Sequence, residues 1–363
     1  MADDEEIILD EKKVDTGFNK CSSCGAEMSY DVDTGTMKCE HCGAEKKIEA
    51  DDIVFRKSMA DYMKGGKANW DRSVFRCNNC GAKGVREGKE INVFCPFCGS
   101  HSVVPTEELP GIKPDAIIPF KIKPEESHEL FTAWAKKTLF APRAFKQHSD
   151  IREHVNRLYM PSWAFTSNAY CEYRGTLGRT VQVQTRSSNG TMTTSYKTIY
   201  FNVSGQMFKN YTDYLVQSSD RVPSVTFKKL GFFAREKKPY RTEFIAGIPC
   251  EHYSRSLDTC FSEFSNFIKG DMRRDIMRRH NADTVQRLDI KLEFPTKEFN
   301  YLLLPLYIAN YAYNNKTYNF FINGVNGKVI GKYPVSKIKV FFLSFTLAAL
   351  AVVGMAAYWW FGR

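Results

Sequence analysis

The chain has 363 residues, of which 43% are hydrophobic and 25% are charged. This composition is typical of folded proteins and argues against a disordered chain, and the length allows two or three domains. The net charge of +10 favours an anionic partner, either a nucleic acid or a membrane surface.

The positive charge is concentrated in the later part of the chain. Residues 1–52 carry 6 Lys and Arg against 15 Asp and Glu, and residues 53–110 carry 9 against 6. Residues 111–363 carry 36 against 20. A nucleic-acid-binding N-terminal region would show the opposite distribution, because phosphate contacts supply most of the affinity. The opening MADDEEIILDEKKVD lacks the basic and apolar regions of a signal peptide, so we expect an acidic, disordered tail at 1–17.

Eight of the eleven cysteines form four knuckles of the pattern C-x2-C-G. Fourteen residues separate the two knuckles of each pair, and the second pair repeats the first 56 positions later. Two cysteines in one tight turn direct both sulfurs to one point, and the following glycine lets the backbone reverse. Two such turns complete the four-thiolate shell of a structural zinc site, so we predict two Zn2+ ions in two small β zinc ribbons. The predicted ligands are Cys21, Cys24, Cys39, Cys42, Cys77, Cys80, Cys95 and Cys98.

Two other interpretations of the knuckles stay open. A disulfide framework would use the same residues, although CxxC turns without a signal peptide favour a reducing compartment and a metal. A rubredoxin-like iron site has the same thiolate geometry. His41 and His101 lie near the knuckles, and we expect neither to be a ligand because four thiolates serve each site. Cys171, Cys250 and Cys260 lack ligand spacing and are expected to be small buried residues rather than nucleophiles.

The part of the chain after the knuckles predicts a mixed α+β body, because helical and strand patterns alternate along it. Asn189-Gly190, at the centre of a polar stretch, predicts a long projecting hairpin. AIIPFKIKP and AGIPCEHYS each precede a helical segment and then MPSW or LPLY, which suggests two similar strand–helix–hairpin halves. The expected helices are 124–140 and 256–288, and the expected strands are 158–175 and 301–324.

The stretch VFFLSFTLAALAVVGMAAYWWFG has 23 residues without a charge. As a helix it would be roughly 34 Å long, enough to cross ~30 Å of hydrocarbon. Lys328, Lys332, Lys337 and Lys339 precede it and only Arg363 follows it, so the positive-inside tendency predicts a single-pass protein of the inner (cell) membrane with its N-terminal region in the cytoplasm. Four N-x-S/T sequons would suit a lumenal domain, but the eight metal-type thiols favour the cytoplasm.

These signals divide the chain into seven segments. They are an acidic tail at 1–17, zinc ribbons at 18–50 and 74–104, a connector at 51–73, a linker at 105–115, the α+β body at 116–336 and a transmembrane helix at 340–362.

Three segments carry a resemblance to a known group of proteins. These segments resemble bacterial membrane proteins described as TFIIB-type zinc-ribbon or primosomal-helicase-like. They are PDAIIPFKI, YMPSWAF and especially YNFFINGVNGKVIGKYPVSKIK. Some members are encoded beside phage-shock-protein-A-like and flotillin-like (SPFH) proteins, which they are thought to recruit or position at the membrane. The resemblance implies that the knuckles are zinc ligands, and it implies no catalytic residue.

No enzyme motif accompanies the knuckles. A helicase needs G-x-x-x-x-G-K-[ST] to hold phosphates, and the sequence has no such run, no GxSxG and no HExxH. We therefore expect a non-enzymatic, tail-anchored adaptor that holds a cytoplasmic partner, of the phage-shock-protein-A or SPFH envelope-stress type, over the anionic leaflet. The alternative is a membrane-tethered nucleic-acid-binding protein. Its basic face would consist of Arg72, Arg76, Lys83, Arg86 and Lys89.

Overall fold

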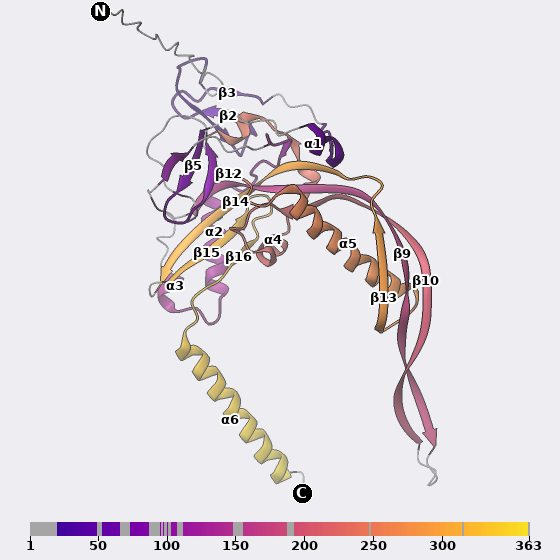
Figure 1. Cartoon of the computed structure of the whole chain (residues 1–363). Helices are drawn as coiled ribbons and strands as arrows, with labels where there is room; N and C mark the ends of the chain where they lie inside the picture. Colours follow the sequence, from indigo (N-terminus) through magenta and orange to yellow (C-terminus); the bar gives the residue numbers. More distant parts are fainter. Residues whose placement is uncertain are drawn as a thin grey trace, which may run out of the picture.

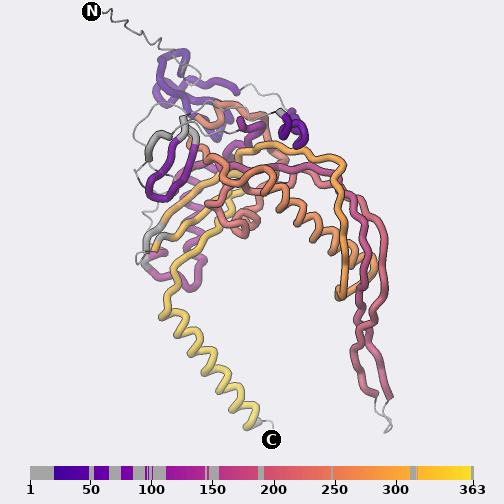
Figure 2. Tube along the Cα trace, in the orientation of Figure 1, coloured from indigo at the N-terminus to yellow at the C-terminus, as the bar shows by residue number. Residues whose placement is uncertain are grey.

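The chain forms a mixed α+β molecule, as its sequence predicted for the fold class. The computed structural model describes residues 20–48, 53–65, 73–86, 95, 97, 100, 103–106, 112–147, 155–186, 192–246, 248–313 and 316–361. The cysteine clusters lie near one end of the molecule, and the apolar helix α6 (Lys337–Phe361) leaves the body at the other (Figure 1). A long β arm curves away from the body on a separate path, as the Cα trace shows (Figure 2).

The centre of the body is the antiparallel pair of β9 (Val155–Arg186) and β14 (Glu298–Tyr313), in which Met160 pairs with Leu304. β8 (Ala116–Ile117) joins β14 in parallel, and β12 (Cys250–Glu251) joins β9 in parallel. Successive side chains of β14 enter two different buried clusters, one on each face of the sheet. Burial on both faces explains why the sequence YLLLPLYIA is apolar without alternation.

The two halves of the body share four elements in the same order, although α3 (Arg143–Gln147) is present only in the first half and β13 (Thr284–Glu293) only in the second. The first half runs β8, α2 (Pro124–Lys137), β9 and β10 (Met192–Gln217). The second half runs β12, α5 (Leu257–Arg279), β14 and β15 (Lys316–Asn323). The short strand of each half pairs with the long strand of the other half. Each part thus contains a short strand, a helix and a hairpin, and the duplication of this unit stays a prediction.

The arm consists of the outer parts of β9 and β10 together with β13 (Thr284–Glu293), which pairs with β9. The β9–β10 ladder runs from Ser162↔Gln217 to Arg186↔Met192, and the predicted turn at Asn189-Gly190 lies outside the described residues. Helix α5 covers one face of the arm near the body. Its buried stripe at helical spacing contains Cys260, Phe264, Ile268, Met272 and Ile276.

The prediction of one helix over 256–288 was wrong at its C-terminal end. Helix α5 ends at Arg279, and Asn281 has a left-handed backbone with φ 49°. The chain then forms β13 from Thr284, because its alternating side chains pair along β9. Val285 and Leu288 are three residues apart, a separation that also fits a helix, which is why the sequence pattern did not show the change.

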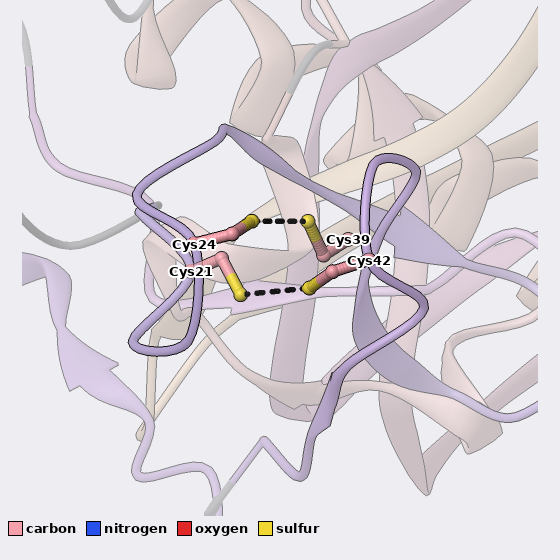
Figure 3. A group of neighbouring side chains, drawn as sticks. All are labelled: Cys21, Cys24, Cys39 and Cys42. Carbon is pink, nitrogen blue, oxygen red and sulfur yellow. Dashed lines mark hydrogen bonds between the residues drawn. The ribbon is translucent and has the colours of Figure 1, made fainter.

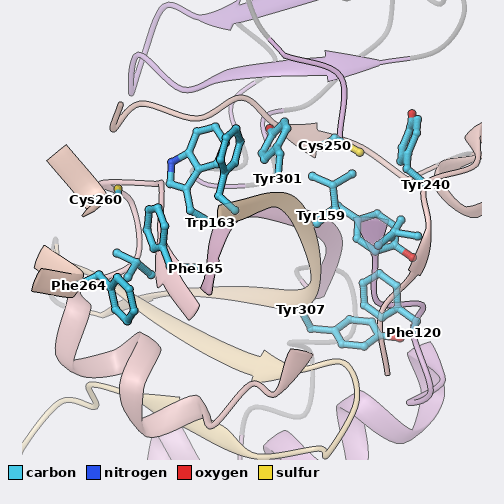
Figure 4. Packing of buried hydrophobic residues seen from close by; sticks show 14 of the residues in the cluster. Phe120, Tyr159, Trp163, Phe165, Tyr240, Cys250, Cys260, Phe264, Tyr301 and Tyr307 are labelled. Atoms are coloured by element: carbon cyan, nitrogen blue, oxygen red, sulfur yellow. The ribbon is translucent and has the colours of Figure 1, made fainter. Parts of the chain in front are cut away.

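The main core is dominated by aromatic side chains (Figure 4). Trp163 and Tyr301 lie 5.0 Å apart between ring centroids, and Phe165 stacks on Phe264 at 5.4 Å. The last contact attaches α5 to β9. Tyr307 donates a hydrogen bond of 2.6 Å to the carbonyl oxygen of Ile122, so its hydroxyl is satisfied inside the core.

The remaining elements are short and surround the central strands. Those before the body are β1 (Met28–Asp31), β2 (Thr36–Cys39), β3 (Glu45–Lys46), β4 (Lys57–Ser58), α1 (Met59–Gly65), β5 (Ser73–Cys77), β6 (Lys83–Arg86) and β7 (Val103–Thr106). Those within the body are α3 (Arg143–Gln147), α4 (Ser224–Leu230), η3 (Ala234–Glu236), β11 (Lys238–Pro239), η4 (Thr242–Ile245) and β16 (Val329–Gly331).

Candidate metal centres

The first cysteine cluster brings together two knuckles that flank the β1–β2 hairpin (Figure 3). The Sγ atoms of Cys21 and Cys42 lie 3.5 Å apart, and those of Cys24 and Cys39 also lie 3.5 Å apart. All four sulfurs lie within 4.8 Å of one another. Cys21 and Cys39 are buried, whereas Cys24 and Cys42 are exposed, so the cluster has one side in the protein and one side at the surface.

The backbone of each knuckle explains why the sequence C-x2-C-G forms this turn. In the first knuckle the N–H of Gly25 donates to the carbonyl oxygen of Cys21 at 2.8 Å, and the N–H of Cys21 donates to Ala26 at 2.8 Å. The knuckles that begin at Cys39 and Cys77 repeat both bonds at 2.8 to 2.9 Å. Gly25 has φ +73°, a left-handed conformation that favours glycine.

The sulfur separations fit a tetrahedral metal site. With metal–sulfur bonds of about 2.3 Å, a tetrahedral four-thiolate shell requires sulfurs about 3.8 Å apart. The two 3.5 Å separations are close to this value. A disulfide would require about 2.05 Å, so the geometry favours the metal interpretation over the disulfide framework. Zinc and iron have the same thiolate geometry, so the geometry leaves the choice between them open.

The buried cysteines of the first cluster lie in an environment that favours the thiolate. Backbone N–H groups of Ser23 and Cys24 lower the pKa of Cys21 to about 6. The backbone N–H of Cys42 lowers the pKa of Cys39 in the same way. Metal binding requires the deprotonated sulfur, which these peptide groups favour at Cys21 and Cys39, whereas at Cys24 and Cys42 contacts with the neighbouring sulfurs outweigh the backbone hydrogen bonds and raise the pKa.

The second cluster contains Cys77, Cys80 and Cys95, with the Sγ atoms of Cys80 and Cys95 3.6 Å apart. Cys98, its predicted fourth ligand, lies outside the described residues. The N–H of Cys95 donates to the carbonyl oxygen of Ser100 at 2.8 Å, which matches the bond from Cys21 to Ala26 in the first knuckle. The structure therefore brings together seven of the eight predicted ligands, and the exposed His41 is part of neither cluster.

Both ribbons are fixed to the body rather than held on free linkers. In the first ribbon, the ring of Tyr30 contacts Phe244 at 5.5 Å, and Lys123 forms an ion pair of 2.6 Å with Asp33. In the second ribbon, β6 pairs with β12 of the body. The body sheet therefore continues into the second ribbon, and both ribbons have defined positions relative to the body.

The other cysteines are buried, as their lack of ligand spacing predicted. Burial raises the pKa of Cys260 to about 11 and also raises the pKa of Cys171. A thiol with a raised pKa is a poor nucleophile at neutral pH. These environments agree with a packing role for Cys171 and Cys260.

Sequence reasoning missed a buried carboxyl group beside the second ribbon. Glu251 on β12 is 3% exposed, and Ser219 donates a hydrogen bond of 2.6 Å to its Oε1. Burial raises the pKa of Glu251 to about 8, although the hydrogen bond from Ser219 and the charge of Arg221 oppose the shift. Glu251 is buried because β12 pairs with both β6 and β9. The local sequence PCEH contains no pattern that predicts this burial.

Comparison with known proteins finds a relative of unknown function. A protein of Bacillus subtilis (strain 168), described as "Uncharacterized protein YdjG", is 28% identical over 232 residues. The match includes 63% of this chain and 66% of the relative, so the chain spans slightly less than two thirds of that protein. No protein-family model matches the chain, and no solved structure matches it.

Proposed function

We propose that this protein is a membrane-anchored adaptor whose zinc-bearing end holds a partner protein at the cytoplasmic face of the cell membrane. The observation that carries the proposal is the position of α6. This helix is long and apolar enough to cross a membrane, and it is not buried against the body. Its 25 residues correspond to about 37 Å of helix, compared with ~30 Å of hydrocarbon.

The exposure of α6 favours a membrane over an aqueous environment. Phe341, Phe345, Leu350 and Trp360 are all more than 60% exposed, and so are most of the large side chains along the helix. A contiguous apolar surface of this length in water would cause association. Tyr358, Trp359 and Trp360 lie near the distal end, where aromatic rings prefer the membrane–water interface.

The charges at the proximal end of α6 support the proposed orientation. Lys332, Lys337 and Lys339 precede the apolar part of the helix, which supports a cytoplasmic body by the positive-inside rule. A cytoplasmic body also keeps the thiols in a reducing compartment. We assign zinc to both clusters, because closed four-cysteine shells are typical of structural zinc sites.

The partner-binding surface in this proposal is the outer side of the first ribbon. Ser22, Ser23, Glu40 and His41 lie in its two knuckle turns and are exposed. The turns lie at the end of the molecule away from α6, so a protein bound there would face the cytoplasm (Figure 1). Because Tyr30 and Asp33 fix the ribbon to the body, the surface is rigid before binding, which lowers the entropic cost of association.

The resemblance of the sequence to zinc-ribbon membrane proteins supports a partner of the phage-shock-protein-A-like or SPFH type. The test is to purify the full chain from detergent-solubilised membranes and identify the proteins that accompany it. We expect the pair Ser22→Arg and His41→Arg to lose the partner, since both change the turn surface and keep every cysteine. The pair Ser262→Arg and Asn266→Arg, on exposed positions of α5, is the matched control.

Two outcomes would count against the adaptor. Equal recovery of the partner with both double variants would exclude the knuckle turns as the binding surface. Loss of the accompanying proteins after nuclease treatment would instead favour the nucleic-acid-binding alternative.

A further inference from the structure

We propose that two segments far apart in the sequence, residues 136–146 and 332–339, together form a platform around the base of α6 that binds anionic lipid headgroups. We call this surface the basal platform. The proposal rests on α6 crossing the membrane, and it adds a second, extramembrane contact between the protein and the bilayer.

Hydrogen bonds join the two segments directly. The N–H of Ser336 donates to the carbonyl oxygen of Phe140 at 2.8 Å. The Nζ of Lys339 donates to the carbonyl oxygen of Ala141 at 2.6 Å. These contacts hold the loop after α2 against the first turn of α6. The loop therefore lies at the same level along the helix as the start of its apolar part.

An aromatic cluster beneath the platform makes it rigid. Trp134 of α2 contacts Tyr333 at 6.0 Å and Phe320 of β15 at 5.1 Å. Phe145 of α3 stacks on Phe320 at 5.7 Å. Each of the two platform segments is thus packed on the body through at least one ring. The backbone that carries the platform cations is therefore held on the body and is not a free linker.

The platform is strongly basic and contains no carboxyl side chain. Neither 136–146 nor 332–339 includes an Asp or Glu. Its cations are Lys136, Lys137, Arg143, Lys146, Lys332, Lys337 and Lys339. Within the described part of the chain, no ion pair involves any of them, whereas the neighbouring Lys121 and Lys123 are both paired. Lys136 and Lys137 also suit the C-terminal end of α2 by charge, but this explanation does not extend to the other five.

Exposed apolar side chains lie among these cations. Leu139 is 69% exposed, Val335 is 57% exposed and Ile338 is 69% exposed. Cations mixed with protruding apolar groups match the headgroup layer of a bilayer, where phosphates meet the first methylene groups. Val340 follows Lys339 directly and begins the uncharged part of α6, so a spanning α6 places the platform at headgroup depth.

The test uses the full chain reconstituted into lipid nanodiscs, with a photoreactive benzoylphenylalanine in place of Leu139. Illumination should attach lipid to this position, and the yield should increase when phosphatidylglycerol replaces part of the phosphatidylcholine. A four-Gln variant should lose the dependence of the adduct yield on phosphatidylglycerol. It carries Lys136→Gln, Lys137→Gln, Arg143→Gln and Lys146→Gln. The control carries the same photoreactive residue in place of Phe55, which is 80% exposed near α1, and should give no lipid adduct.

Failure of this proposal can be separated from failure of the membrane anchor. If alkaline extraction leaves the chain in the membrane but position 139 gives no more lipid adduct than position 55, the basal platform is refuted and the anchor is retained. If the same variant in cell membranes yields a protein adduct at position 139 in place of a lipid adduct, the surface belongs to a protein partner, and the lipid proposal is again refuted. An unchanged unfolding temperature of the four-Gln variant confirms that its effect is electrostatic.

Discussion

The Nζ of Lys237 lies 2.7 Å from Oδ1 of Asp213, and Nε of Arg56 lies 3.4 Å from the same oxygen. Asp213 occupies the irregularity of the β9–β10 ladder between Tyr211 and Tyr214, with a left-handed φ of 51°. Arg56 belongs to the segment between the two ribbons. The ion pair between Arg56 and Asp213 therefore connects the base of the arm to the N-terminal part of the chain.

We expect Lys237→Met to destabilise the protein by about 2–3 kcal/mol at neutral pH. This is somewhat below the ~3–5 kcal/mol typical of breaking a fully buried pair, because both side chains keep some solvent contact. Although burial opposes it, hydrogen bonds from Lys237 and Arg56 lower the pKa of Asp213. The ion pair between Lys237 and Asp213 stabilises the fold at pH values above 3.8, the usual pKa of the carboxyl group. This contribution is lost as the pH falls through the lowered pKa of Asp213 in the folded state.

Denaturant unfolding of the full chain in detergent at neutral and acidic pH measures both effects. The matched control is Lys121→Met, which breaks an exposed ion pair with Glu236 and should change the free energy of unfolding by less than about 1 kcal/mol. Equal losses in the two variants would show that the Asp213 network has no special role.

The metal clusters lead to a second prediction. Cys39→Ser should reduce the bound metal from two ions per chain to one and destabilise the protein by more than about 3 kcal/mol, because the proposed ion would hold together a ribbon that is part of the main core. Elemental analysis of the purified chain measures the metal content. Cys171→Ala removes another buried sulfur and should keep both ions. Two ions in the Cys39 variant would contradict the four-thiolate site.

The knuckles could be predicted from sequence because their geometry is local. Cys21 and Cys24 belong to one turn, and the turn is closed by backbone bonds within six residues. The basal platform could not be predicted in this way. The bond between Ser336 and Phe140 depends on α2 and β15 packing through Trp134 and Phe320, which is a product of the whole fold.

The relation between the two halves shows a subtler limit of sequence comparison. The similarity of AIIPF to AGIPC aligns Phe120 with Cys250. In the structure, Ile117 pairs with Leu303 and Cys250 pairs with Tyr159. Leu304 pairs with Met160, and Leu303 and Tyr159 directly precede these two residues, so we compare Leu303 with Tyr159. The structure therefore matches Ile117 with Cys250, three residues from the alignment that the motifs suggest.

Glu251 predicts a pH dependence with the opposite sign to that of Asp213. Its folded-state pKa is raised from 4.5 to about 8, chiefly by burial, so the folded chain retains a proton that the unfolded chain releases. The contribution of protonated Glu251 to the free energy of unfolding is complete below about pH 4.5 and is lost as the pH rises toward 8. Glu251→Gln keeps the neutral shape, so we expect it to raise the unfolding temperature by several degrees near neutral pH.

Thermal unfolding of both proteins across this pH range tests the assignment. The difference between them should vanish at the acidic end, where the wild-type carboxyl group is already protonated. Glu236→Gln alters an exposed carboxyl group and is the matched control, with no comparable change in slope. A wild-type slope that persists in Glu251→Gln would assign the dependence to other groups.

The proposed membrane span gives the last prediction, at the middle of α6. An arginine at the centre of a spanning helix costs about 2.5–3.5 kcal/mol for insertion, whereas an exposed arginine on a water-facing helix costs little. Leu350→Arg should therefore shift a large fraction of the chain into the alkaline-soluble fraction of cell membranes, while Leu350→Ala should stay in the pellet. Val225→Arg, at a 65% exposed position of α4, is the control for an added charge outside the helix and should behave as the wild type. If Leu350→Arg stays in the pellet to the same extent as Val225→Arg, α6 does not cross the bilayer, and the cations at its base have no reason to face lipid.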